Sequence, residues 1–137
     1  REAVWWAARV CDDYLAVVQM TEAERAEQKA VLAIVRKWVH EPEEQLRLTV
    51  HRAALDLANR LPAHWVGMSV FWATGDITPD TGVVTPPPPY LYARGVSASI
   101  DLAASLAIQS REALYARAVG RGLDVASGGD GETVITL

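Results

Sequence analysis

The chain has 137 residues and a mass of 14.9 kDa, which fits one domain that buries well over half of its unfolded surface. Its content of 50% hydrophobic and 22% charged residues excludes intrinsic disorder. The net charge of -4 excludes a strongly basic surface, so nucleic acid is not an expected partner.

The first two predicted helices are marked by apolar spacing and by a start signal. From Val4 to Val18, apolar residues recur at intervals of four and three, which places them on one helical face. Thr21 and Glu24 have the spacing of a capping box, in which each side chain satisfies a backbone donor of the other. A second helix is therefore expected to begin at Glu22.

Later boundaries follow from proline, serine and glycine. Pro42 and Pro62 suit first helical turns, where a missing amide hydrogen leaves no bond unmade. Ser110 is expected to cap the last helix, and Gly128 follows its end. The predicted helices cover Glu2–Val18, Glu22–His40, Pro42–Arg60, Ala63–Ala73, Leu91–Gln109 and Arg111–Ser127.

The stretch "TGVVTPPPPYLYARG" separates the fourth predicted helix from the fifth. Pro86 to Pro89 form a run that is expected to be extended at about 3 Å per residue. The run is either a ligand for a groove-bearing partner, since it ends in a Pro-Pro-x-Tyr pattern, or a stiff strut across the outside of the fold. We favour the strut, with Tyr90 and Tyr92 packed against the helices to fasten it.

The predicted fold class is all-α: a single compact bundle of five or six helices with a long proline-rich extended loop between helices four and five. The helical domain is expected to cover residues 1–128. Residues 129–137 are expected to form a flexible or short extended tail, because no partner strand is apparent for "DGETVITL".

No constellation of reactive residues stands out, so no catalytic residue, metal ligand or cofactor is predicted. His40, His51 and His64 lie on three different segments without a zinc-like spacing, and are expected at the surface or at helix ends. Cys11 lies on the apolar stripe of the first helix and is expected to be a core residue. We therefore expect no enzymatic activity.

The expected compartment is the cytoplasm. A single cysteine excludes an internal disulfide and suits a reducing compartment. The sequence opens directly on a helical pattern, and it contains no apolar run of about 18 residues, so no membrane insertion is expected.

The aromatic residues suggest a surface for a partner. Five tryptophans are many for a chain of this length. Adjacent helical residues point about 100° apart, so Trp5 and Trp6 cannot both face the centre of one buried stripe, and the same holds for Phe71 and Trp72. They either cover a helix enclosed on two sides or form an interface, in which tryptophan is a good anchor.

The combined pattern resembles a bacterial family of unknown function. The segments that carry the resemblance are "REAVWWAARV", "WVGMSVFWATGDITP", "VVTPPPPYLYARGV" and "GRGLDVASG", which together span nearly all of residues 1–128. Members of that family are encoded beside type VI secretion genes in some bacteria, so the resemblance implies an accessory, adaptor or effector-handling role. The tail "DGETVITL" does not match the family pattern.

Two classes of function stay open from the sequence. The favoured one is a non-catalytic accessory or adaptor that binds another protein, such as a secretion effector or component. The alternative is an enzyme or small-ligand-binding protein whose site forms only in three dimensions, and self-association is a further possibility. The residues predicted to bind a partner are Trp5, Trp6, Trp72, Asp76, Pro79, Pro87, Pro88 and Tyr90.

Overall fold

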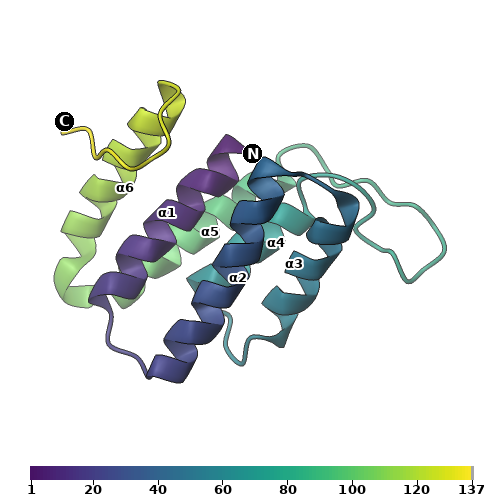
Figure 1. Ribbon diagram of the computed structural model, residues 1–137, viewed down its shortest axis with the longest axis horizontal. Coiled ribbons are helices and arrows are strands. Elements are labelled where there is room, and N and C mark those ends of the chain that lie inside the picture. The colour runs from purple at the N-terminus through teal and green to yellow at the C-terminus, as the bar shows by residue number, and fades with distance from the viewer. Residues whose placement is uncertain (137) are drawn as a thin grey trace.

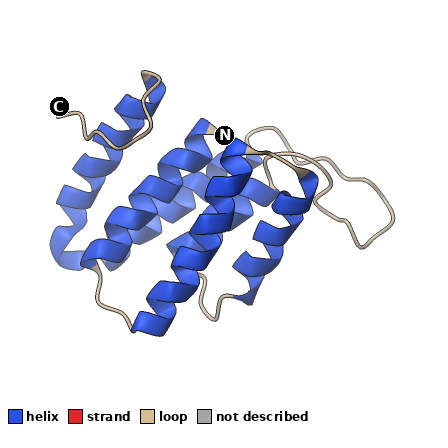
Figure 2. Ribbon diagram, viewed as in Figure 1, coloured by secondary structure: helices blue, strands red, loops and turns tan. Residues whose placement is uncertain are grey.

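Helices joined by loops make up the computed structural model, which describes residues 1–136 (Figure 1; Figure 2). Leu137, the last residue of the predicted tail, lies outside it. No strand occurs in the described residues, and the predicted all-α class is confirmed. The elements are α1 (Glu2–Val17), α2 (Glu22–His40), α3 (Glu44–Asp56), α4 (Pro62–Phe71), α5 (Leu91–Leu106), a 3₁₀ turn (Ile108–Ser110) and α6 (Arg111–Ala126).

The short helix α4 lies at the centre of the bundle. It packs against α1, α2, α3 and α5, and it buries residues on every side, as its nearly unbroken apolar sequence "PAHWVGMSVF" requires. Helix α6 packs against α1 and α5 at one edge of the bundle, while α3 and the α4–α5 loop, residues 72–90, lie at the other edge (Figure 1). Within residues 1–136, none of the helices combines the length and the apolarity needed to cross a bilayer.

Two sequence predictions about the first helices are confirmed. The Thr21 hydroxyl accepts a hydrogen bond from the Glu24 backbone N–H at 3.2 Å, and the Glu24 carboxylate accepts one from the Thr21 N–H at 3.0 Å. These bonds satisfy donors at the start of α2. Cys11 lies fully buried in the core, and burial raises the pKa of its thiol, which stays protonated.

Helix α3 is shorter at both ends than the predicted Pro42–Arg60. A tight turn, in which the Glu43 N–H donates to the Glu41 carbonyl at 2.7 Å, places Pro42 before the helix. At the other end, Leu57 is already extended, with ψ of 130°. Pro62 holds the residue before it out of the helical region, so α3 must end early enough for the chain to turn into α4.

The last two helices also differ from prediction. Helix α5 ends at Leu106 rather than Gln109, and a 3₁₀ turn links it to α6. Ser110 precedes α6 without a side-chain capping bond, because its backbone belongs to that turn and not to the extended region that a capping residue needs. After Ala126 the chain reverses and runs back across α6 and α1.

The contact between α3 and α4 depends on Gly67. A Cβ atom at this position would lie 2.6 Å from the Cβ of Ala54, closer than van der Waals contact permits. We predict that Gly67→Ala lowers the free energy of unfolding by about 1–3 kcal/mol, since the helices must move apart. The matched change Ala33→Ser also adds one atom, but on an exposed face of α2, and should cost no more than about 0.5 kcal/mol in the same urea titration. Equal losses for both variants would contradict the close packing.

Candidate functional site

Arg47 fastens the α4–α5 loop to the bundle. This arginine of α3 is 0% exposed, and its guanidinium group forms hydrogen bonds with residues of α3, α4 and the loop. Its Nη1 donates to the carbonyl of Phe71 at 2.7 Å, and Nη2 donates to the carbonyl of Asp76 at 3.1 Å. The Glu44 carboxylate accepts from Nε and Nη2, both at 2.7 Å, and these bonds lower the pKa of Glu44. A buried guanidinium is tolerated when it is paired in this way.

The residues around Arg47 leave space for its planar guanidinium group. The guanidinium carbon lies 4.8 Å from the centre of the Phe71 ring, whose other contact is the imidazole of His51, stacked at 3.6 Å with an angle of 6°. Gly75 has a φ of +76°, and a Cβ atom there would lie 2.7 Å from Nη2 of Arg47. Only glycine fits both the conformation and the space.

Asp76 closes the loop on itself. Its Oδ1 accepts hydrogen bonds from the backbone N–H groups of Thr85 and Thr78, both at 2.9 Å. The Ile77 N–H donates to the Thr85 carbonyl, also at 2.9 Å. The bonds from the Thr85 and Thr78 amides lower the pKa of Asp76. One carboxylate therefore joins the two ends of residues 76–85.

A groove lies between α3 and this loop, and we call it the α3–loop groove. It has a volume of about 560 Å³, and its walls are Leu48, His51, Arg52 and Leu55 of α3 opposite Ile77, Thr78, Pro79, Asp80 and Thr81 of the loop. Burial, reinforced by the positive charge of Arg47, lowers the pKa of His51, so this imidazole is neutral at pH 7. The groove is thus mainly apolar, with a neutral histidine in its wall and an aspartate at its edge.

Apolar side chains are exposed near the groove. Leu55 is 56% exposed, and Val83 and Val84, at the far end of the loop, are 67% and 78% exposed. The Val83 carbonyl accepts a hydrogen bond from the hydroxyl of Thr78, at 3.1 Å, which ties the valines to the loop's internal bonds. These valines are held outward by an ordered loop.

The proline run leads into α5 without the fastening that was expected of Tyr90. The Pro88 carbonyl accepts a hydrogen bond from the Leu91 N–H at 3.1 Å, and Pro87 is half-buried. Tyr90 adopts a left-handed conformation, with φ of 63°, in which the chain turns from the prolines into the helix. Its side chain is 75% exposed, so the prediction that it packs against the helices is wrong, whereas Tyr92 is half-buried.

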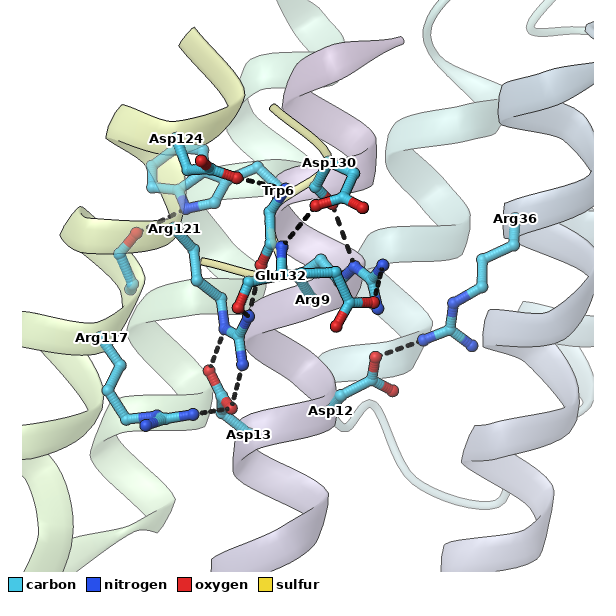
Figure 3. Close-up of polar contacts among 12 residues, drawn as sticks. Trp6, Arg9, Asp12, Asp13, Arg36, Arg117, Arg121, Asp124, Asp130 and Glu132 are labelled. Carbon is cyan, nitrogen blue, oxygen red and sulfur yellow. Dashed lines mark hydrogen bonds and ion pairs between the residues drawn. The ribbon is translucent and has the colours of Figure 1, made fainter. Parts of the chain in front are cut away.

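The predicted partner-binding residues fall into two groups. Trp72, Asp76 and Pro79 lie with the prolines in the α4–α5 loop, and Trp72 packs half-buried against Trp65 with ring centres 6.4 Å apart. Trp5 instead donates to the Asp130 carbonyl after α6, and Trp6 donates to the Ala118 carbonyl of α6 (Figure 3 shows Trp6).

The three histidines occupy different environments. His40 is exposed at the end of α2, where Trp5 meets it edge to face at 5.3 Å. His64 is buried near the start of α4, and its Nδ1 lies 2.9 Å from the Ala54 carbonyl oxygen. The expectation of a surface or helix-end position therefore holds for His64 through its place near the start of α4, and a hydrogen bond satisfies the buried ring.

Arg47 is the functional residue that the sequence reasoning missed. The sequence analysis assigns it no role, although it lies three and seven residues before Val50 and Ala54, which are buried. An arginine in line with an apolar stripe, with an acidic residue three positions before it, is the signal that could have found it.

Comparison with known proteins identifies a family but no activity. The model of a family of unknown function, DUF6931, matches residues 1–126, so the chain belongs to that family. No curated protein and no solved structure matches the chain.

Replacement of Arg47 tests whether it fastens the loop. Arg47→Met fills a similar volume but leaves the buried Phe71 carbonyl and the part-buried Asp76 carbonyl without their donor, so we predict a loss of about 2–4 kcal/mol in unfolding free energy. Amide exchange of Ile77 and Thr85 should also accelerate. Lys37→Met, on the exposed face of α2, also removes one positive charge and should change neither quantity appreciably. Unchanged exchange in the Arg47 variant would show that the loop is held by other contacts.

The lowered pKa of Asp76 gives a dependence on pH. Its hydrogen bonds favour the carboxylate, so their contribution is fully present above the unfolded pKa of about 3.9 and is lost as the pH falls through the lower folded value. We predict that the amide resonances of Thr78 and Thr85 shift together with a midpoint below about 3.9. Asp76→Asn should abolish this transition; its persistence would assign it to another group.

Proposed function

We propose that this member of the family is a non-catalytic accessory or adaptor protein that binds another protein through the α3–loop groove and the adjacent loop tip, Val83 and Val84. The observation that carries the proposal is the exposure of these neighbouring valines on a loop whose backbone is fixed by Asp76 and Arg47. Isolated apolar residues on a surface need no explanation, but a group beside an apolar groove favours a contact surface.

Fixation of the loop supports binding energetically. A flexible loop loses conformational entropy when a partner orders it, and that loss reduces affinity. Here the loop is already held by hydrogen bonds at Asp76, including that from Arg47 to its carbonyl, and its second half is stiffened by prolines. Little further ordering is needed when a partner binds.

The chemistry of the groove defines the partner's side of the contact. Leu48, Leu55 and Ile77 offer apolar walls, so the partner is expected to insert an aliphatic or aromatic side chain. Arg52 and Asp80 at the same groove offer one charge of each sign for polar contacts around it. We further propose that the partner is a component or an effector of a type VI secretion system, on the strength of the family resemblance in the sequence.

A small-ligand site is the second candidate, and His51 is the observation that favours it. A neutral imidazole in a groove wall can donate or accept one hydrogen bond, and Asp80 lines the same groove. Such a ligand would shift the His51 ring resonances at saturating concentration while leaving Val83 and Val84 unaffected.

Substitution at the loop tip tests the protein-binding function. We predict that the double variant Val83→Ser, Val84→Ser loses a partner that the wild-type chain captures by cross-linking from its native cells, with no change in melting temperature, because both side chains are exposed. The control Val17→Ser alters another valine that is 53% exposed, at the end of α1, and should capture the partner normally. Mass spectrometry identifies the captured protein. Equal recovery with both variants would remove the loop tip from the interface.

A further inference from the structure

The residues after α6 fold back into a groove formed by α1 and α6. The turn begins where the Gly129 N–H donates to the Asp124 carbonyl at 2.9 Å, and Gly128 there has a φ of +90°. Residues 130–135, which we call the tail segment, then cross the two helices in an extended path (Figure 1; Figure 3). This segment lies beyond residues 1–126, the part that the family model matches.

Helix α1 supplies one set of contacts to the tail segment. The Trp5 indole N–H donates to the Asp130 carbonyl, and Nε of Arg9 donates to the same oxygen at 3.3 Å. Arg9 also forms an ion pair with the Glu132 carboxylate, and its guanidinium lies 4.7 Å from the centre of the Trp5 ring. One acidic side chain and one backbone carbonyl are therefore recognised from this side.

Helix α6 supplies the complementary contacts. Nη1 of Arg121 donates to the Gly131 carbonyl and, at 3.2 Å, to the Glu132 carbonyl. The Asp124 carboxylate accepts the Gly131 N–H at 2.8 Å. Side chains of α6 thus bind consecutive backbone groups of the tail segment.

Two glycines determine what fits. Gly131 is buried with a φ of +74°, and a Cβ atom there would lie 3.2 Å from both Arg9 and Val125. On the helix, a Cβ at Gly120 would lie 2.5 Å from the Ile135 carbonyl oxygen. The groove therefore requires glycine in the bound segment, followed by an acidic residue that pairs with Arg9.

Hydrogen bonds between α1 and α6 hold Arg121 in position independently of the tail segment. The Asp13 carboxylate accepts two hydrogen bonds from Arg121, at 2.6 and 2.9 Å, and a third from Arg117 at 2.9 Å (Figure 3). Burial opposes ionisation of Asp13, but these hydrogen bonds outweigh it and lower its pKa. Arg121 thus keeps its orientation, with Nη1 directed at the groove, when the tail leaves.

The tail segment itself is weakly held. Glu132 and Thr133 are exposed, and an exposed ion pair such as that of Glu132 contributes little stability. The backbone bond from the Ile135 N–H to the Gly120 carbonyl is 3.3 Å long. Segments with few buried apolar contacts open locally at low cost, and Gly128 offers a hinge.

We propose that the α1–α6 groove is a binding site for an extended acidic segment of a partner protein, in which glycine is followed by glutamate or aspartate, and that the tail segment occupies it as an intramolecular competitor. This site is separate from the α3–loop groove, at the opposite edge of the bundle (Figure 1). The ion pair of Arg9 with Glu132 and the contacts of Arg121 with two backbone carbonyls, together with the segment seated there, identify the occupant.

The test uses the full chain and a synthetic peptide, "GGDGETVIT", with the sequence of residues 128–136. In the chain, Gly131→Ala weakens the tail's own fit and raises the fraction of open groove, so the peptide should bind about tenfold more tightly than to the wild type. The same change made in the peptide should weaken its binding to the Gly131→Ala chain about tenfold. The Trp5 indole N–H resonance reports occupancy.

A groove-side variant and a mass measurement complete the test. Arg9→Ala, introduced together with Gly131→Ala, should abolish the gain in peptide affinity while circular dichroism remains helical. Equal peptide affinity of the wild-type and Gly131→Ala chains, or equal affinity for the two peptides, would overturn the proposal. Dimers that exchange tails, detected by light scattering and dissociated by the peptide, would also overturn it, because the occupant would then be a second copy.

Discussion

The burial of one guanidinium, that of Arg47, determines how the loop edge of the molecule is built. A fully buried arginine is unstable unless its charge and its N–H groups find partners. Glu44 supplies the charge, and the carbonyls of Phe71 and Asp76 supply the remaining acceptors. Because the Asp76 carbonyl belongs to the loop, the loop cannot move away without removing an acceptor from this buried guanidinium.

Two parts of that loop avoid unsatisfied backbone N–H groups in different ways. The backbone N–H groups of residues 76–85 need acceptors, and the Asp76 carboxylate accepts two of them within the loop. Residues 86–89 are prolines, which have no N–H to satisfy and whose backbone is already restricted before folding. A loop of this length therefore stays ordered although much of it is exposed.

The sequence predicted the helices, which follow from the repeated spacing of apolar residues, and missed the features that depend on the contacts of single side chains. Apolar periodicity located all the helices, and Thr21 with Glu24 fixed the start of α2, because such signals are local. The early end of α3, the buried place of Arg47 and the exposure of Tyr90 depend on contacts between distant segments, which periodicity does not report. Trp5 and Trp6 were correctly singled out as a pair that one stripe cannot bury, yet the sequence did not indicate that α6 and the tail cover them.

The same arrangement, an arginine held by a carboxylate and bound to backbone carbonyls, occurs at both edges of the bundle but is more deeply buried at one of them. In each, a carboxylate holds one side of an arginine, Glu44 for Arg47 and Asp13 for Arg121, and the remaining N–H groups bind carbonyls of a non-helical segment. The Arg47 side chain is 0% exposed, so loss of the Asp76 carbonyl would remove an acceptor from a buried N–H group even though Glu44 stays paired. The Arg121 side chain is 12% exposed and keeps Asp13 when the tail departs, so water can replace the tail's carbonyls at lower cost. The same chemistry therefore fixes one segment in place and holds the other less firmly, in keeping with the two separate contact surfaces that we propose.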